Sequence, residues 1–317
     1  MDYPIIGRSK TSQLLIKTIH RIAATRRDLL IIGESGVGKG TLAKSIYQVS
    51  RSDSESVPFL SLNLSAIDEK EVEYMLFGNQ SRHVPSAKRR SAVQKEHGGF
   101  VLIEDIEEGN LLSQMKVLKF IEESRSKKSG SEKNISTGIR FIVTMKENPV
   151  ELVRKRNLLE ELQKIFMKFE TVYIPPLCER REDIPLLVKH FKDTLCKDLN
   201  LPDVDIDAYS IEVLVHQPWY GNIRELKAVT DQCILYLKDG GFTLPPEMVD
   251  EKTEIIKMLD NVKSGQKFTL RHSLGIIERG IIERVLKRFG FNQRRASTFL
   301  GMNQQSLRYR LKRLSIP

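Results

Sequence analysis

Cysteines are few in this sequence, and long hydrophobic segments are missing. Its three cysteines, Cys178, Cys196 and Cys233, are scattered, with neither Cys-x-x-Cys spacing nor a histidine cluster nearby. We therefore expect no disulfide and no structural zinc site. No stretch approaches the roughly 18 consecutive apolar residues of a membrane-spanning helix, and the first residues lack the basic-then-apolar pattern of a secretory signal. These absences favour a cytoplasmic protein without a membrane partner.

Acidic residues are scarce at the C-terminal end of the chain. The formal net charge is +10 over 317 residues, and residues 271–317 alone hold 11 lysines or arginines against 2 acidic residues, an excess of 9 positive charges. The rest of the chain is therefore nearly neutral. A basic segment of this kind is either a solvated helical surface or a nucleic-acid-binding surface, and charge alone does not decide between them.

Four segments follow one another along the chain. In the first, short β-rich runs alternate with amphipathic helical patterns, which is typical of an α/β domain with a largely parallel sheet. The apolar runs predict buried strands at residues 28–32, 58–62, 100–103 and 139–143. Pro175 and Pro176 end a further strand, and a more helical stretch follows. The expected boundaries are 1–175 for the α/β part, 176–245 for the helical part, 246–268 for a linker and 269–317 for a compact helical tail.

A glycine-rich loop stands between the run that ends at Ile32 and a helical pattern. Residues 33–41 read GESGVGKGT, which matches G-x-x-x-x-G-K in the context of a strand that feeds a helix. Glycines let consecutive N–H groups point at phosphate oxygens, and Lys39 and the helix dipole add positive charge. The expected phosphate-binding residues are Gly33, Glu34, Ser35, Gly36, Val37, Gly38, Lys39, Gly40 and Thr41. The alternative is a glycine-rich turn with a stray lysine.

Two features near this loop bear on metal binding. Gly40 stands where a serine or threonine usually offers its hydroxyl to magnesium, and Thr41 is displaced from that position by one residue. The acidic pair Glu104 and Asp105 follows the run at 100–103. Carboxylates at a strand end beside a phosphate loop hold Mg²⁺ and orient an attacking water. The alternative is that the two acids begin a solvated loop.

The tail predicts a helix-turn-helix domain. Apolar residues at 276, 277, 281, 282, 285 and 286 follow helical spacing and predict one buried stripe. Gly290 ends this first helix. Asn292 can cap a second helix, in which Ala296 and Leu300 face inward, and Gly301 makes a tight turn. Asn303 can cap a third helix, whose inward residues are Leu307, Leu311 and Leu314.

The third helix carries polar and basic residues that its core does not need, namely Gln304, Gln305, Ser306, Arg308, Tyr309, Arg310, Lys312 and Arg313. Gln304, Gln305 and Arg308 suit base edges in the major groove. Side chains suited to backbone phosphates are Arg294, Arg295, Arg310, Lys312 and Arg313. Any one of them could be a solvated surface residue, but the set predicts double-stranded DNA as a partner, and the stripe on the first helix predicts dimerisation.

Several stretches resemble the AAA+ domains of the NtrC family of bacterial enhancer-binding proteins, and the tail resembles the Fis-type DNA-binding domain that ends them. The stretches are IIG at 5–7, GESGVGKG at 33–40, PFLSLN at 58–63, LFG at 76–78, HGGFVLIED at 97–105, IPPLCERREDIPLL at 174–187 and PWYGNIREL at 218–226. The resemblance implies an α/β AAA+ P-loop domain, a parallel sheet flanked by helices, with a helical lid subdomain and an all-α helix-turn-helix domain. In that family ATP and Mg²⁺ bind between the subunits of a ring, and hydrolysis remodels RNA polymerase carrying sigma-54.

The resemblance also assigns roles to single residues. Lys39 and its glycines are expected to hold the triphosphate, and Glu104 or Asp105 to serve the water and the metal, with Glu104 as metal ligand. Asn63 matches the position that restrains the catalytic carboxylate. Arg224 matches the lid arginine that senses the nucleotide, although an arginine on an exposed helix is otherwise a surface residue.

Departures from the family pattern are concentrated at two functions. Residues 82–87 read RHVPSA where the family carries GAFTGA, the loop that touches sigma-54. The acidic pair is Glu-Asp rather than Asp-Glu, and Lys146 stands where an asparagine usually ends its strand. The stretch at 158–166 lacks the arginines that reach a neighbouring subunit's site, a loss of about a thousandfold or more in rate; Arg154 and Arg156 lie nearby in sequence as substitutes or as a solvated turn.

These features rank three hypotheses. The first is a DNA-binding transcription regulator whose ATP-binding AAA+ domain assembles in response to nucleotide, as a dimer or hexameric ring, without sigma-54 contact and with weak or absent ATP hydrolysis. The alternative is an ATP-hydrolysing, sigma-54-dependent activator that remodels RNA polymerase through a divergent loop. A third is a DNA-binding adaptor that has lost nucleotide binding.

Overall fold

A computed structural model describes residues 5–50, 57–78, 98–125, 138–235, 242, 244–245 and 270–314. The chain divides into two compact units, Met1–Leu195 with Gln217–Thr230 and Cys196–His216 with Asp231–Pro317, and each is considered by itself. The predicted linker at 246–268 and the RHVPSA stretch at 82–87 lie outside the described residues.

The first unit is built on a five-stranded parallel sheet. Its strands are β1 (Leu29–Ile32), β2 (Phe59–Asn63), β3 (Gly98–Glu104), β4 (Gly138–Met145) and β5 (Glu170–Tyr173), in the order β2-β3-β4-β1-β5. The four strands expected from apolar runs are confirmed, and the fifth ends just before Pro175. β1 lies between β4 and β5 rather than beside β2, so the strand order reverses next to β1. Open α/β sheets bind their ligands outside the carboxyl ends of the strands at such a point.

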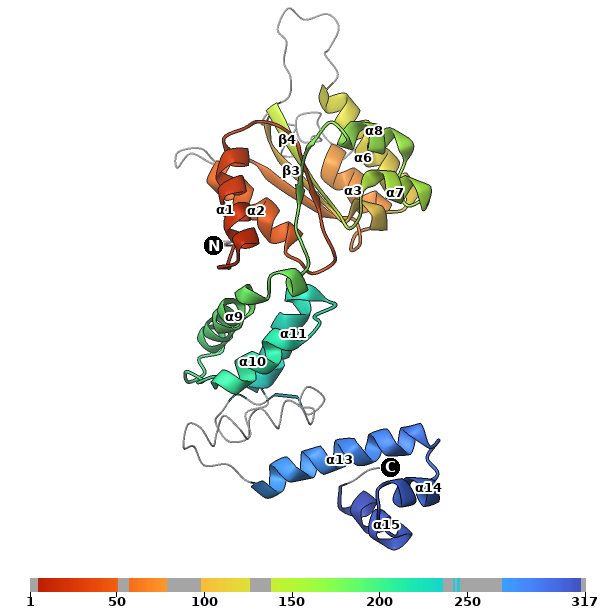
Figure 1. Cartoon of the computed structure of the whole chain (residues 1–317). Helices are drawn as coiled ribbons and strands as arrows, with labels where there is room; N and C mark the ends of the chain where they lie inside the picture. Colours follow the sequence, from red (N-terminus) through yellow and green to blue (C-terminus); the bar gives the residue numbers. More distant parts are fainter. Residues whose placement is uncertain are drawn as a thin grey trace, which may run out of the picture. The chain divides into compact units, whose positions relative to one another are not determined.

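Helices cover both faces of this sheet (Figure 1). On one face lie α1 (Lys10–Ala23) and α2 (Lys39–Ser50), and on the other α3 (Glu69–Phe77), α6 (Leu111–Arg125), α7 (Pro149–Arg154) and α8 (Glu160–Phe166). Leu29 and Ile31 of β1 pack with the first group, whereas Leu30 and Ile32 pack with the second. This alternation along a strand buried on both faces explains why the β1 sequence is apolar throughout.

Single-turn helices follow two of the strands. The single-turn helices are η1 (Ile106–Glu108), after β3, and η2 (Leu177–Glu179) and η3 (Arg181–Asp183), after β5. The longer helices are α9 (Ile184–Asp198), α10 (Ala208–His216) and α11 (Asn222–Leu235). They confirm the helical stretch that the sequence predicts after Pro176. No helix in the described ranges is both long and apolar enough to cross a membrane.

Three helices form the C-terminal domain: α13 (Leu270–Arg288), α14 (Gln293–Phe299) and α15 (Gln304–Arg313). Both predicted caps are present, since the side chain of Asn292 accepts from Arg295 N at 3.1 Å and that of Asn303 from Ser306 N at 2.7 Å. Gly290 and Gly301 have φ of 56° and 65°, the left-handed conformation that a tight turn requires. The core residues are Ile282, Val285, Leu286, Ala296, Leu307 and Leu311.

One expectation for α13 is wrong in detail. Ile281, which was expected in the buried stripe, is 48% exposed. The core that α13 shares with α14 and α15 is built on Ile282, Val285 and Leu286, so their neighbour Ile281 points away from it. Leu270 and Leu274 are also about half exposed on this helix. The apolar residues of α13 therefore lie on two surfaces. One packs in the core of the domain, and the other, with Leu270, Leu274 and Ile281, is exposed to solvent.

Candidate nucleotide site and nucleic-acid interface

The phosphate-binding loop leaves the carboxyl end of β1 and enters α2 directly. Gly36 and Gly38 have φ of 78° and 103°, a region that residues with a Cβ rarely adopt. A Cβ on Gly36 would also lie 2.2 Å from the carbonyl oxygen of Gly221. Backbone conformation and close packing therefore both require glycine at this position, which argues against a chance glycine-rich turn.

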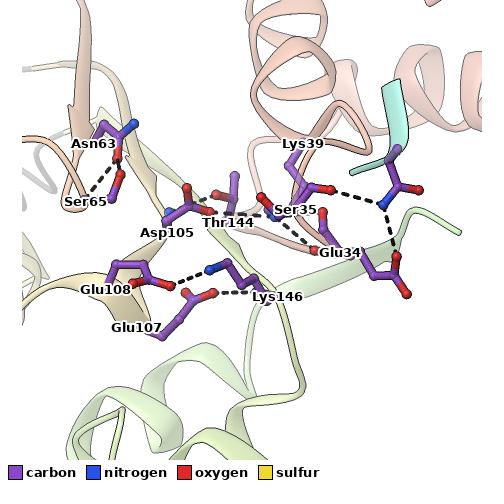
Figure 2. A network of polar contacts seen from close by, with 12 residues as sticks. Glu34, Ser35, Lys39, Asn63, Ser65, Asp105, Glu107, Glu108, Thr144 and Lys146 are labelled. Carbon is purple, nitrogen blue, oxygen red and sulfur yellow. Dashed lines mark hydrogen bonds and ion pairs between the residues drawn. The ribbon is translucent and has the colours of Figure 1, made fainter. Parts of the chain in front are cut away.

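Lys39 closes the loop from the first residue of α2. Its side chain is 7% exposed, and Nζ donates to the carbonyl oxygens of Gly33 at 2.9 Å and Glu34 at 3.1 Å. Nζ also lies 3.6 Å from Oδ1 of Asp105, as Figure 2 shows. Burial lowers the pKa of Lys39, and the carboxylates of Asp105 and Glu107 oppose that shift. The ammonium group of Lys39 therefore lies inside the loop, against the loop's backbone carbonyls.

The two acids at the carboxyl end of β3 face different partners. Asp105 adopts φ 51° and ψ 53°, and its backbone N donates to Oγ1 of Thr144, at the end of β4, at 3.1 Å. Glu104 is the last residue of β3, and its Oε1 accepts from Ser61 Oγ at 3.2 Å. Gly40 lies against the other oxygen of Glu104. The structure therefore brings together the loop and the acidic pair that the sequence predicts as one site.

Asn63 lies beside Glu104 in the register of β2 and β3. Its side-chain oxygen accepts from Ser65 N at 3.0 Å and from Ser65 Oγ at 2.7 Å (Figure 2). The amide is therefore fixed at the same end of the sheet as the acidic pair.

A second polar cluster follows the acidic pair. Lys146, next after β4, donates from its backbone N to Oε1 of Glu107 at 2.7 Å, and its Nζ pairs with Glu108 (Figure 2). Burial raises the pKa of Glu107, whose Oε2 lacks a hydrogen-bond partner among the residues described. The hydrogen bond with Glu108 raises the pKa of Lys146. Lys146, at the position where the family pattern has an asparagine, is therefore a cation whose charge is balanced by Glu108.

Residues at the start of α11 reach the phosphate loop. Arg224 Nη1 donates to Ser35 Oγ at 3.1 Å, so the expected sensing arginine lies at the loop. Asn222, which the sequence analysis did not single out, is fully buried with φ 56°. Its Nδ2 donates to Glu34 Oε2 at 3.0 Å and to the carbonyl of Ser35 at 3.1 Å, and its Oδ1 accepts from Leu177 N at 2.7 Å. The Gly-Asn pair that opens this helix was the available signal.

An apolar cavity of about 250 Å³ adjoins the loop. Ile5, Ile6, Val37, Thr41 and Phe191 are among the residues that line it. Thr41 therefore faces the cavity. The volume and apolar walls of the cavity suit a flat heterocycle that is attached to a phosphate chain in the neighbouring loop.

Arg180 is the buried cation of this cavity. Its Nη2 donates to the carbonyl of Val37 at 2.8 Å, and its Nε has no hydrogen-bond partner within the described part of the chain. Burial lowers the pKa of Arg180. The residue ties the segment after β5 to the phosphate loop.

The C-terminal domain displays most of the predicted DNA-contacting side chains. Exposed residues are Arg294, Arg295, Gln305, Arg308, Tyr309, Lys312 and Arg313, whereas Gln304, Ser306 and Arg310 are half-buried. Arg308 Nε lies 3.3 Å from Oε1 of Gln293. Arg310 and Arg313 both form ion pairs with Glu278 of α13. These two arginines therefore also fasten α15 to the first helix of the domain.

Three family descriptions match successive parts of the chain. Residues 5–174 match the sigma-54 interaction domain, residues 178–254 the AAA+ ATPase lid domain, and residues 273–314 the bacterial regulatory protein, Fis family. The first match spans more than half of the chain.

Similar proteins include characterised regulators. The chain is 30% identical over 320 residues to the transcriptional activator RocR of Bacillus subtilis, a match that covers 98% of this chain and 68% of RocR. It is 27% identical over 342 residues to the DNA-binding transcriptional regulator NtrC of a Bradyrhizobium species, covering 99% and 70% of the two chains. The crystal structure of NtrX from Brucella abortus in complex with ADP aligns with a TM-score of 0.66 and 25% identity, over 100% of this chain and 70% of that one. The expected AAA+ sheet with a lid and a C-terminal helix-turn-helix is confirmed.

Proposed function

The chain belongs to the sigma-54 interaction domain family of bacterial transcription regulators, and from that membership we propose that it is a DNA-binding regulator whose AAA+ domain binds ATP with Mg²⁺. The observation that carries the proposal is the convergence of Lys39, Asp105 and Arg224 on one glycine-rich loop, although they come from α2, the end of β3 and α11. Phosphates would occupy the loop, and the base would enter the apolar cavity beside it.

The residues at the loop fit a magnesium nucleotide. Glu104 and Asp105 supply hard carboxylate oxygens beside Lys39, and Mg²⁺ is usually held by one or two carboxylates together with the phosphates of its nucleotide. Asn63 would orient these acids from the neighbouring strand, and Arg224 would contact the terminal phosphate from α11. Glu34, Ser35 and the loop backbone would surround the phosphates. The expected division into 1–175, 176–245, 246–268 and 269–317 is part of this proposal.

We further propose that ATP turnover is weak or absent. One of the two nearby candidates to replace the missing arginines, Arg154, is paired within its own helix turn, with Glu151 at 2.7 Å, and is 72% exposed. Lys146, in place of the usual asparagine, is neutralised by Glu108. ATP would act mainly by favouring a ring or dimer, and assembly would alter DNA occupancy or contact with RNA polymerase.

DNA binding would use α14 and α15. Gln304, Gln305 and Arg308 are proposed to read bases, and Arg294, Arg295, Arg310, Lys312 and Arg313 to contact phosphates, with Ser306 and Tyr309 on the same helix. The exposed apolar residues of α13, Leu270, Leu274 and Ile281, support self-association through that helix on a two-fold DNA site. Such a regulator would act in the cytoplasm, where the DNA lies.

The RHVPSA sequence at 82–87 supports a regulator that works without sigma-54 contact through that loop. A second candidate is an ATP-hydrolysing sigma-54-dependent activator, which the match of residues 5–174 to a sigma-54 interaction domain favours. A third, a DNA-binding adaptor without nucleotide, would be favoured if ATP did not raise the melting temperature.

Genome-wide mapping of bound sites, with and without the gene for sigma-54, separates the first two. The proposal expects sites and transcriptional output that do not depend on sigma-54. Overlap with sigma-54 promoters, together with loss of output in its absence, would replace it by the second candidate. Steady-state ATP hydrolysis would also favour the second candidate if Lys39→Ala abolished it and self-association stimulated it.

A further inference from the structure

The two acidic residues of the basic tail have different partners. Residues 271–317 contain only Glu278 and Glu283 as acids, and both lie on α13. Glu283 pairs within its own helix, with Arg279 Nε at 2.8 Å. Glu278 instead reaches the third helix, where Arg310 and Arg313 both form ion pairs with it. One of the two negative charges of the tail therefore lies directly on cations of α15.

These ion pairs are not what holds the domain together. An apolar core that includes Ile282, Leu286 and Leu307 already joins the three helices. The side chains of Arg310 and Arg313 are 41% and 44% exposed. Ion pairs at such exposure contribute little to folding stability, because water and salt screen the charges. The main effect of the Glu278 carboxylate is therefore on the charge that α15 presents to a partner.

Both arginines face the surface that would meet DNA. They line a hollow of about 340 Å³ together with Gln305, Ser306 and Tyr309 of the same helix. The side chain of Glu278 is 21% exposed, about half as much as either arginine. Solvent thus reaches the guanidinium groups more readily than it reaches the carboxylate. A phosphate oxygen can approach the two arginines from the open side while Glu278 is still in place.

We propose that Glu278 is an intramolecular competitor of DNA phosphates. It occupies Arg310 and Arg313 in the free protein, and a duplex must displace it to form the two phosphate contacts. This inference rests on the proposed DNA binding. Carboxylate and phosphate oxygens accept the same charge-assisted hydrogen bonds from arginine, so one can replace the other. The ion pairs that are lost offset part of the attraction to phosphate. Because phosphate contacts carry no sequence information, Glu278 lowers the affinity for all sequences alike.

Four variants of the full chain test this competition. Glu278→Gln removes the charge and keeps the shape of the side chain. Glu283→Gln is the matched control, since it makes the same change of charge on the same helix at a residue paired within α13. A chain with Arg310→Ala and Arg313→Ala lacks the contested cations, and a triple variant adds Glu278→Gln to it. Circular dichroism melting shows that each variant is folded before its binding is compared.

Fluorescence anisotropy with a selected duplex and its scrambled counterpart gives the Kd at several salt concentrations. Glu278→Gln should tighten binding to both duplexes by about fivefold, the scale of one exposed ion pair, and Glu283→Gln by much less. The salt slope should change by less than about 1, since the same phosphates are neutralised in both complexes. Without the two arginines, Glu278→Gln should tighten binding no more than Glu283→Gln does.

Three results would overturn the inference and leave DNA binding standing. The first is a folded Glu278→Gln variant that binds no more tightly than the unaltered chain. The second is equal tightening by Glu283→Gln, which would reduce the effect to net charge. The third is tightening that persists in the chain without Arg310 and Arg313. Failure of the unaltered chain to bind either duplex would instead reject the proposed function.

Discussion

Asp183 and Ser9, 174 positions apart in the chain, are joined by two hydrogen bonds, from Ser9 N to Oδ1 at 2.7 Å and from Ser9 Oγ to Oδ2 at 2.8 Å. Asp183 is completely buried and also accepts from Arg8 N at 2.7 Å and Ser12 Oγ at 2.6 Å. Ser9 is in turn the N-cap of α1. This carboxylate therefore fixes the N-terminal segment, whose residues Ile5 and Ile6 line the apolar cavity, against the segment after β5.

Asp183→Ala is expected to destabilise the protein strongly. Removal of the carboxylate leaves several buried donors without an acceptor, which costs about 3 kcal/mol or more of unfolding free energy. Urea unfolding measures the change. Asp193→Ala removes a carboxylate that is 51% exposed, and should shift stability by about 0.5 kcal/mol or less. Similar losses in the two variants would mean that the Asp183 anchor contributes little.

Lys39→Ala is expected to weaken ATP binding by about 100-fold, because loss of a charge-assisted hydrogen bond costs roughly 2.7 kcal/mol. Isothermal titration gives the affinity. Lys119→Ala, on α6, removes a lysine that is 68% exposed and should leave affinity unchanged. Equal affinities of the Lys39 and Lys119 variants would place the nucleotide somewhere other than this loop.

The cysteines give a prediction that depends on pH. All three thiols are free, and burial raises the pKa of Cys233 to about 12 from its usual 9.0. Between these two values the unfolded chain releases a proton that the folded chain keeps, so stability should fall as pH rises through this window. The slope due to Cys233 is at most about 1.4 kcal/mol per pH unit, and no such effect is present below the window.

Two measurements check this behaviour. Iodoacetamide at pH 8, followed by mass spectrometry, should label the exposed Cys178 and spare Cys233. Cys233→Ala should flatten the dependence of unfolding free energy on pH in the alkaline window, and Cys178→Ala should leave it as it is. Rapid labelling of Cys233 in the folded protein would contradict the burial of its thiol.

The two proposed groups of DNA contacts should differ in how binding responds to salt. Arg294→Ala and Arg295→Ala should weaken all sequences alike and reduce the salt slope by about 1 each. Gln305→Ala and Arg308→Ala should lower discrimination between specific and scrambled duplexes by about 1–3 kcal/mol. Fluorescence anisotropy at several salt concentrations measures both. The assignment of roles is wrong if the α14 arginines alter sequence preference more than the α15 residues do.

Features set by neighbouring residues were predictable from the sequence. The strand that ends at Ile32, the turn at Gly36 and the caps at Asn292 and Asn303 depend on local conformation and on periodic burial, and each is present. The chemistry of the loop was predictable for the same reason, because its residues are contiguous.

Contacts between distant residues were not predictable in this way. The sequence showed that Gly40 lacks a hydroxyl and that Glu104 is longer than aspartate, but not that the two meet. The bond between Asn222 and the phosphate loop joins residues 188 apart, so the Gly-Asn pair at the start of α11 could mark Asn222 but not the residue that it contacts. Ile281 illustrates the remaining limit, because helical spacing identifies an apolar face but not which part of it a partner covers.

We propose that nucleotide bound at the Lys39 loop changes how the C-terminal domain engages DNA. The most direct measurement is the Kd of the full chain for a selected duplex, by fluorescence anisotropy, with and without saturating ATP and Mg²⁺. ATP should tighten binding of the unaltered chain by about fivefold or more, a usual scale for allosteric coupling, and should have no effect on Lys39→Ala. Identical DNA affinities with and without ATP, in a chain that titration shows to be nucleotide-bound, would contradict the claim.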